Sequence, residues 1–472
     1  MSNNALRMPP RPSLRNWLYT NIVYPKLQPQ TFAGLRNRVQ RHAQRERLTL
    51  EQSQQQQWRD LKRILEHAYT TTEFYKQRFD RAGIHPEEIR NPADLTALPI
   101  LERDELKSSV ERMLSSKFPR EQLRLTKTGG TSSASVPFYR DPDGEREKYA
   151  LQLRFQEWAG MFPGDKVAYL WGSPWDYPQK PSWRWWIYDQ HIMRNLWLPT
   201  VGMDAQLMET YRQQINRFKP KILYAYPTPL AFFCRFLKET GRPYVRPKAV
   251  ICTAEELGPH RQVIEEVFQA PVYEHYGSRE FGIMAAQCEY GAMHLSPALT
   301  YVEFLPVANA ADEGLCEMIV TDLVNYGMPL IRYRIRDCVL LGNRACPCGR
   351  GFRVIDKIAG RSATLFTMPS GKVVMGLNAT LYLSPACPEI KEMQIIQDTL
   401  HDFRLRYVAR EPLDEAAFAR LRQHLEVFFG PDLKWTFESI SAIAPEKSGK
   451  TRYCVSYVTP GQTEEKAGGK LS

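Results

Sequence analysis

Residues 220–257 read PKILYAYPTPLAFFCRFLKETGRPYVRPKAVICTAEEL and contain two short apolar runs, ILYA and AVICT. Between them, 230–240 has the spacing of a helix, and another helical pattern at 206–218 precedes the first run. An earlier apolar run, KVAYLWG at 166–172, has the same character. Buried strands that alternate with helices are typical of parallel sheets with crossover connections. We therefore predict an α/β fold for residues 120–340.

The regions on either side of this core follow other patterns. Residues 50–116 read as helices with loops, because apolar side chains recur at helical spacing until prolines interrupt them. Residues 341–361 are rich in Gly, Cys and Arg and are interpreted as a linker. The remainder predicts a small α+β unit, with a strand at 403–410 and an amphipathic helix at 414–429.

The composition sets limits on the class of protein. The chain has 472 residues, of which 43% are hydrophobic and 24% charged. These proportions exclude a disordered chain, a collagen and a disulfide-rich miniprotein. No apolar run approaches the ~18 residues of a membrane-spanning helix, and the N-terminus lacks an apolar signal core. We expect a cytoplasmic protein in which the nine cysteines stay reduced, so that clustered thiols are metal ligands.

The basic surplus lies in an N-terminal arm, residues 1–48. The formal net charge is +11, and the arm holds nine basic residues against one acidic residue, Glu46. It also carries a short apolar stripe at helical spacing, made of Leu14, Trp17, Leu18 and Ile22. Two interpretations remain open. The arm makes peripheral contact with a membrane, or the stripe packs onto the body of the protein and the arginines are solvated.

Six of the ten tryptophans fall within residues 171–197. Such a segment suits an aromatic-walled acyl or aryl pocket. It also suits a membrane-interface surface or an ordinary core with an exposed loop, and the sequence leaves these three interpretations open.

The first of four candidate site segments is KTGGTSSAS at 127–135. Glycines and small hydroxyl residues present N–H and O–H donors with little bulk, as a bound polyphosphate requires. A flexible Ser-rich turn is the alternative. The candidate phosphate-binding residues are Thr128, Gly129, Gly130, Thr131, Ser132 and Ser133.

The second segment is YGSREFG at 276–282. A tight turn through Gly277 and Ser278 places the ring of Tyr276 against a base and the carboxylate of Glu280 on Mg²⁺. Taken alone, this short segment is a weak signal.

The third and fourth segments add further polar groups. RYRIRD at 332–337 ends in Asp337, whose carboxylate suits the two hydroxyls of a ribose, and Arg361 follows Gly360. A surface ion-pair cluster is the alternative there. The fourth segment is PEKSGKTR at 445–452. Residues 444–451 are similar to a Walker A loop with Ala444 in place of its first glycine, but a strand-like run follows where that loop opens a helix. Lys450 of this segment lies on a glycine turn that lets it reach a substrate phosphate.

In this order and spacing, the four segments resemble the adenylate-forming superfamily of acyl-CoA synthetases, luciferases and adenylation domains. The resemblance spans roughly residues 50–455 and is strongest to the phenylacetate–CoA ligase branch, including its capsule-biosynthesis-type members. It implies a large N-terminal α/β domain with parallel or mixed sheets and a small α+β lid domain. The expected parts are a basic arm with a helical region (1–116), a nucleotide- and acyl-binding core (117–358), a lid (359–460) and a disordered tail (461–472).

The resemblance also implies roles for single residues. Residues 128–135 match the phosphate loop, Tyr276 stacks on adenine and Glu280 binds Mg²⁺. Asp337 holds the ribose, Arg361 lies near ribose and phosphate, and Lys450 is the lid lysine of the adenylation step. Further residues of the nucleotide pocket are Gly277, Ser278 and Glu255, the last in the segment TAEEL.

The activity implied is ATP-dependent conversion of a small carboxylic acid to an acyl-adenylate. The acyl group then passes to a thiol, either of CoA or of the pantetheine of an acyl carrier protein. Two departures from the family pattern, Ser133 in the phosphate loop and Ser362-Ala363-Thr364 where hinge aspartates are usual, keep two alternatives open. These are an adenylyltransferase that makes no thioester and a non-catalytic, membrane-associated member of a polysaccharide or lipid pathway.

Four residues form a candidate zinc set: Cys288, His294, Cys346 and Cys348. Three thiols and one imidazole make a closed tetrahedral site, which is typical of structural zinc. A nucleic-acid zinc knuckle is the first alternative, but no basic or aromatic cluster surrounds these residues, and we expect no nucleic-acid partner. Four unbound residues are the second alternative.

Overall fold

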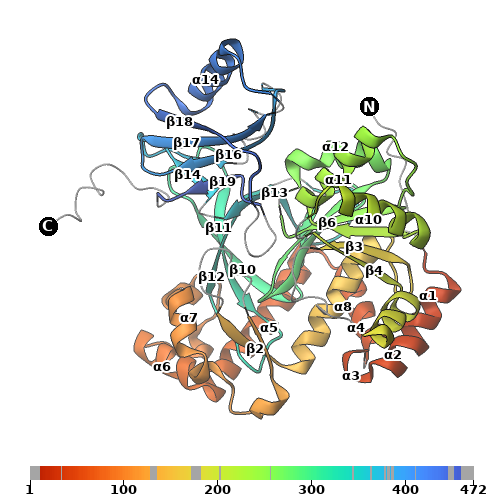
Figure 1. The fold of residues 1–472 in the computed structure, drawn as a ribbon. Coiled ribbons are helices and arrows are strands. Elements are labelled where there is room, and N and C mark those ends of the chain that lie inside the picture. The colour runs from red at the N-terminus through yellow and green to blue at the C-terminus, as the bar shows by residue number, and fades with distance from the viewer. Residues whose placement is uncertain are drawn as a thin grey trace. The chain divides into compact units, whose positions relative to one another are not determined.

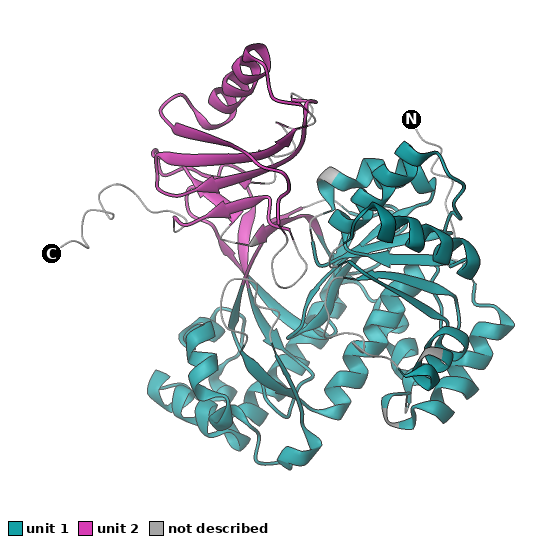
Figure 2. Ribbon diagram, in the orientation of Figure 1, with its two compact units in different colours: residues 1–303, 319–335, 343–354 teal, residues 304–318, 336–342, 355–472 magenta. Residues whose placement is uncertain are grey.

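The computed structural model describes most of the chain between residues 11 and 458. The segments outside the description are 1–10, 33, 128–135, 172–181, 201–202, 256, 343–344, 362–363, 377–378, 380–382, 384–386, 410, 445–450 and 459–472. Two compact units are present (Figure 2). Unit 1 comprises Met1–Glu303, Ile319–Ile335 and Asn343–Val354, and unit 2 comprises Phe304–Met318, Arg336–Gly342 and Ile355–Ser472.

The core of unit 1 is a sheet with the strand order β9-β8-β7-β6-β5-β3-β4 (Figure 1). Strands β3 to β7 run parallel, and β8 and β9 continue the sheet antiparallel. Their bounds are β3 Val167–Trp171, β4 Asn195–Pro199, β5 Ile222–Ala225, β6 Ala249–Thr253, β7 Val272–Ser278, β8 Gly282–Gln287 and β9 Met293–Leu295. The predicted α/β fold is confirmed, because three strands lie where the apolar runs predict them.

Helices connect the parallel strands and cover the sheet. α10 (Ala205–Phe218) leads into β5, α11 (Pro227–Thr240) leads toward β6, and α12 (Arg261–Phe268) leads into β7. Their apolar faces pack against strand residues that are fully buried, Leu223 and Val250 among them. Pro227 occupies the first turn of α11 and Gly241 ends it at a φ of +61°, so the sequence itself sets both ends of this helix.

Further helices and strands surround this sheet. Further helices of unit 1 are α5 (Leu50–Thr71), α6 (Glu73–Ala82), α7 (Arg103–Ser109) and α8 (Pro142–Trp158). A short hairpin pairs β1 (Arg124–Lys127) with β2 (Pro137–Arg140). Four strands contribute residues to both units: β10 (Thr300–Pro306), β11 (Leu315–Asp322), β12 (Tyr333–Leu341) and β13 (Arg353–Arg361).

The N-terminal arm packs onto α8. It folds into α1 (Leu14–Leu18), the π-helix η1 (Tyr19–Val23), α2 (Tyr24–Leu27), α3 (Pro29–Phe32) and α4 (Leu35–Arg45). Its buried apolar side chains include those of Tyr24, Phe32 and Leu35, which lie against Ala150 and Leu153 of α8.

The apolar stripe of the arm stays exposed. The exposed fractions are 76% for Leu14, 48% for Trp17, 40% for Leu18 and 38% for Ile22. The interpretation that this stripe packs onto the body is therefore wrong, because other side chains of the arm fill that contact. The arginines are not all solvated either, since Arg38 and Arg41 both form ion pairs with Glu147 of α8.

Unit 2 contains the predicted α+β elements. A four-stranded sheet has the order β18-β17-β16-β19, and α14 (Glu415–Phe429) packs on it. Its strands are β16 (Ile390–Gln397), β17 (Asp402–Ala409), β18 (Lys434–Ser439) and β19 (Cys454–Ser456), and a hairpin pairs β14 (Leu365–Thr367) with β15 (Val373–Met375). The strand expected at 403–410 and the helix expected at 414–429 are confirmed within one residue.

The linker interpretation of residues 341–361 is wrong for its second half. Residues 353–361 form β13, which pairs antiparallel with β12. The side chains of Val354, Ile355 and Ala359 are buried in this strand. The sequence does not indicate a strand there, because Gly, Cys and Arg dominate the composition of the segment and hide these apolar positions. Among the helices in the described ranges, none combines the length and hydrophobicity of a membrane-spanning segment.

A buried ion pair in unit 1 gives a test of the fold. The guanidinium of Arg332 donates to both carboxylate oxygens of Glu303, at 2.9 and 3.0 Å, and both side chains are nearly buried. We expect Glu303→Gln to lower the free energy of unfolding by about 3–5 kcal/mol, because the buried guanidinium loses its counter-charge. Urea unfolding followed by tryptophan fluorescence measures the change.

The matched control is Asp80→Asn, which removes the exposed ion pair between Asp80 and Lys76. We expect no measurable change from it, because water screens exposed pairs. Equal unfolding midpoints for wild-type protein and Glu303→Gln would contradict the expectation.

Candidate functional site

The carboxyl ends of β6 and β7 bring two of the candidate segments together. The strands are parallel and pair Thr253 with His275, and the Thr253 hydroxyl donates to the His275 carbonyl oxygen at 2.9 Å. Glu255 follows β6, and Tyr276 lies near the end of β7. The carboxyl edge of a parallel sheet is where open α/β folds bind ligands.

Glu255, which follows β6 in the chain, lies beside the first turn of α11 in space. Its carboxylate accepts a hydrogen bond from the backbone N–H of Thr228 at 3.1 Å, in the first turn of that helix. The preceding residue, Ala254, has a φ of +73°, which is unusual for a residue with a Cβ. This carboxylate therefore helps to fix the turn after β6.

The second segment forms a tight turn between β7 and β8. A Cβ on Gly277 would lie 2.1 Å from the carbonyl oxygen of Gly282, so only glycine fits. The hydroxyl of Ser278 accepts a hydrogen bond from the N–H of Phe281 at 3.3 Å. The side chain of Tyr276 is mostly buried beside this turn.

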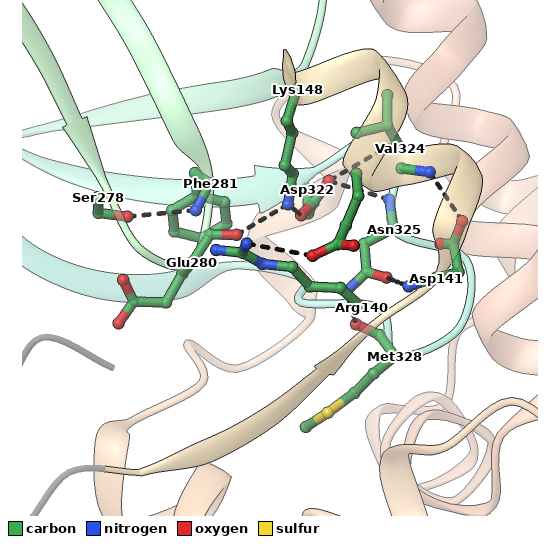
Figure 3. A network of polar contacts seen from close by, with 12 residues as sticks. Arg140, Asp141, Lys148, Ser278, Glu280, Phe281, Asp322, Val324, Asn325 and Met328 are labelled. Carbon is green, nitrogen blue, oxygen red and sulfur yellow. Dashed lines mark hydrogen bonds and ion pairs between the residues drawn. The ribbon is translucent and has the colours of Figure 1, made fainter. Parts of the chain in front are cut away.

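Glu280 has the feature that a metal ligand requires. Only 7% of the residue is exposed, yet no side chain or backbone group in the described part of the chain donates to its carboxylate. Figure 3 shows this carboxylate directed away from the neighbouring cations Arg140 and Lys148. A nearly buried carboxylate to which no described residue donates suits a cation that is brought by a ligand. The residue thus fits a bound Mg²⁺.

Two cations hold the backbone of this turn, the buried Lys148, whose contact with Glu280 is drawn in Figure 3, and the partly buried Arg140. The ammonium group of Lys148 donates to the carbonyl oxygen of Glu280 at 2.8 Å and to the carboxylate of Asp322 at 2.6 Å. The guanidinium of Arg140 donates to the carbonyl oxygen of Arg279. Burial lowers the pKa of Lys148, and the charge of Asp322 opposes that shift. Burial also lowers the pKa of Arg140.

Sequence analysis misses these cations, although one signal points to Lys148. It falls on the buried face of α8, at helical spacing from Leu151 and Phe155. A lysine on the apolar face of a helix needs a buried partner, and Asp322 at the end of β11 supplies it. That partner is distant in sequence and has no signal of its own.

The four candidate zinc ligands converge in unit 1. One ligand atom from each lies within 4.8 Å of the others. The Sγ atoms of Cys288 and Cys346 are 3.6 Å apart, and Sγ of Cys348 lies 3.3 Å from Nε2 of His294. The three cysteines are free thiols. Atoms this close with soft donor character fit a tetrahedral zinc ion.

The N-terminal arm is attached beside this cluster. Glu46 accepts hydrogen bonds from the Arg154 guanidinium at 2.7 and 2.8 Å and from Nε1 of Trp158 at 3.1 Å. The N–H of Gly351 donates to the Glu46 carbonyl oxygen at 3.1 Å. A Cβ on Gly351 would lie 1.8 Å from the carbonyl oxygen of Leu48, so the two backbones are in direct contact.

The remaining candidate residues lie elsewhere. In unit 2, Asp337 of β12 is paired in register with Arg361 of β13. The phosphate-loop candidates and the lid lysine lie outside the described residues: Thr128, Gly129, Gly130, Thr131, Ser132, Ser133 and Lys450.

Comparisons with known proteins support one family. Residues 366–457 match the model of the CapK C-terminal domain. Protein CapK of Staphylococcus aureus is 23% identical over 394 residues, covering 82% of this chain and 85% of CapK. Phenylacetate-coenzyme A ligase of Escherichia coli (strain K12) is 26% identical over 339 residues, covering 67% of this chain and 73% of the ligase.

Solved structures show the same fold. A 2-hydroxyisobutyryl-CoA ligase in the postadenylation state superposes with a TM-score of 0.70 at 18% identity, covering 88% of this chain and 91% of that one. An anthranilate CoA ligase in complex with anthranoyl-AMP gives a TM-score of 0.52 at 14% identity, covering 77% and 74%. The chain therefore has the fold of the adenylate-forming CoA ligases and is a homologue of CapK and of the phenylacetate–CoA ligases.

Proposed function

We propose that this protein is an ATP-dependent acid–thiol ligase. A substrate carboxylate oxygen attacks the α-phosphorus of ATP, and pyrophosphate leaves. A thiolate then attacks the carbonyl carbon of the acyl-adenylate, and AMP leaves. The observation that carries the proposal is the nearly buried Glu280 carboxylate, which has no partner among the described residues, at the carboxyl edge of an adenylate-forming fold.

The proposed roles follow the chemistry of each group. Mg²⁺ on Glu280 would neutralise the charge of the phosphates, and Tyr276 would stack on adenine. Asp337 would hold the ribose, and Arg361 would lie near the ribose and a phosphate. In such a step the protein does little covalent chemistry. It accelerates the reaction mainly by positioning the reactants and by neutralising charge.

The thiol acceptor is proposed to be CoA, because the similar proteins include a phenylacetate-coenzyme A ligase and a 2-hydroxyisobutyryl-CoA ligase. The pantetheine of an acyl carrier protein offers the same thiol. An adenylyltransferase that makes no thioester and a non-catalytic, membrane-associated member of a polysaccharide or lipid pathway are the alternative outcomes.

Pyrophosphate release tests the proposal directly. We expect release from MgATP with one class within a panel of aryl, fatty and hydroxy acids, without any thiol. Lys450→Ala should lower this rate by about 10²–10³-fold, because a positive charge is lost from the transition state. Lys447→Ala, three residues away in the same segment, is the matched control and should leave the rate unchanged.

Three results decide between the alternatives. Release that persists at full rate in Lys450→Ala would remove that lysine from the mechanism. Acyl-AMP that accumulates and does not react when CoA or a carrier protein is added would favour the adenylyltransferase. No release with any acid, on folded protein, would favour the non-catalytic alternative.

We further propose that Cys288, His294, Cys346 and Cys348 bind one structural zinc ion. The convergence of four soft ligand atoms within 4.8 Å supports this proposal. The ion would join the loop after β8 to the segment before β13, and four protein ligands would leave no open position for catalysis.

Chelation and substitution test the zinc site. We expect about one zinc per chain by atomic absorption, and its loss in Cys348→Ser. Thermal stability should fall in that variant, because metal binding contributes folding free energy. Cys387→Ser, a buried thiol far from the cluster in sequence, is the control and should retain the metal. Zinc-free wild-type protein with unchanged stability would contradict the proposal.

The exposed stripe of the arm supports a proposal of peripheral membrane contact. Leu14, Trp17 and Ile22 expose apolar surface, and residues 11–45 carry seven basic residues and no acidic one. Amphipathic segments of this kind lie in the interface of anionic bilayers.

Vesicle sedimentation tests this contact. We expect the full chain to sediment with phosphatidylserine-containing vesicles and not with phosphatidylcholine alone. Substitution of Trp17→Ser together with Ile22→Ser should weaken binding by at least about tenfold, because two inserted apolar side chains are lost. Val427→Ser on α14 removes an even more exposed apolar residue in unit 2 and is the control. Unchanged sedimentation of the double variant would reject the arm as the contact.

A further inference from the structure

The turn that carries Glu280 is held at two consecutive carbonyl oxygens by two cations, the buried Lys148 and the partly buried Arg140. Arg140 donates to the carbonyl of Arg279, and Lys148 donates to the carbonyl of Glu280 at 2.8 Å. Figure 3 shows both cations on one side of this backbone and the Glu280 carboxylate on the other. We name Arg140 and Lys148 the carbonyl clamp.

The ammonium group of Lys148 is itself fixed. Asp322 is fully buried, and its Oδ2 accepts from Lys148 at 2.6 Å. Its Oδ1 accepts from the N–H groups of Val324 and Asn325 at 2.9 and 3.1 Å. Both carboxylate oxygens are therefore committed, and the ammonium cannot move without breaking buried hydrogen bonds.

A rigid frame connects the two members of the clamp. Asp141 follows Arg140 and caps α8, accepting from the N–H of Gly144 at 2.8 Å. Its other oxygen accepts from the N–H groups of Tyr326 and Gly327 at 2.7 and 3.2 Å. Lys148 lies one helical turn after Gly144 in the same helix. Arg140, Asp141 and Lys148 thus hold a fixed spacing.

The backbone after the turn continues into β8, where Gly282 is paired in register with Ser278. Gly282 follows with a φ of +76°, and a Cβ there would meet the Cβ of Lys148 at 3.3 Å. A glycine in this conformation does not restrict the preceding peptides by its own side chain. The donated hydrogen bonds at Arg279 and Glu280 do restrict them.

We propose that Arg140 and Lys148 are positioning residues that fix the main chain of Glu280 and thereby place its carboxylate for Mg²⁺. This inference rests on the proposed function, in which Glu280 binds the ion. When a group that orients a metal ligand through a hydrogen bond is removed, the metal affinity typically falls by about 10–100-fold. A purely structural ion pair between Lys148 and Asp322 would change stability and leave the metal dependence unaltered.

Lys148→Met tests the clamp. We expect the Mg²⁺ concentration for half-maximal pyrophosphate release to rise about 10–100-fold, with a smaller loss of rate at saturating Mg²⁺. Binding of Mn²⁺ in the presence of ATP, followed by the electron paramagnetic resonance signal of free Mn²⁺, should weaken by the same factor without any turnover.

Two further variants separate positioning from folding. Lys148→Met leaves the Asp322 carboxylate uncompensated, so the double variant Lys148→Met with Asp322→Asn restores a neutral pair if the single variant fails to fold. Lys166→Met is the matched control, because its ammonium group also donates to a carbonyl oxygen, that of Phe218, at 2.9 Å. It should leave the Mg²⁺ and Mn²⁺ dependence unchanged.

The outcomes are distinguishable. Folded Lys148→Met protein with wild-type Mg²⁺ and Mn²⁺ dependence would overturn the clamp, as would an equal shift in Lys166→Met. Wild-type protein that releases no pyrophosphate with any acid would overturn the proposed function, and the Mn²⁺ titration would then decide the clamp by itself. Wild-type protein that binds no Mn²⁺ with ATP would overturn both.

Discussion

A buried ammonium group must find a counter-charge, and this requirement organises unit 1 around Lys148. The residue is 7% exposed and its partner Asp322 is fully buried. Removing such charges from water costs several kcal/mol per ion unless the geometry is well satisfied. Helix α8, the end of β11 and the turn after β7 supply that geometry together. The candidate site is built where these three segments meet.

The parts of the fold that sequence predicts best are those with a strong period. β5, β6, α10 and α11 lie where apolar runs and helical spacing place them, because burial of one face or of a whole strand imposes the pattern. The lid elements β17 and α14 follow for the same reason. The strand at residues 353–361 is not predicted, because its apolar residues lie in a segment whose composition is otherwise polar.

The candidate site is only partly visible in the sequence. Local motifs identify Tyr276 and Glu280, since a turn and its carboxylate lie within a few residues. The Cys and His set is found because ligand chemistry is specific to residue type. The clamp is not found, because Arg140 and Asp322 acquire their role from contacts with residues more than a hundred positions away. The exposure of the stripe cannot be predicted either, because it depends on which side chains of the arm pack against the body. The structure buries Tyr24, Phe32 and Leu35 in that contact.

The contact between Gly351 and Leu48 has a consequence for synthesis. The arm is synthesised before the backbone that it docks against, which follows about 300 residues later, roughly 15–60 s at ordinary elongation rates. During that interval Glu46 and Leu48 lack the backbone of Gly351, whereas Ala150 and Leu153, which pack with Tyr24, Phe32 and Leu35, are made well before it. Docking of the end of the arm is therefore a late step, because it waits until Gly351 has been synthesised.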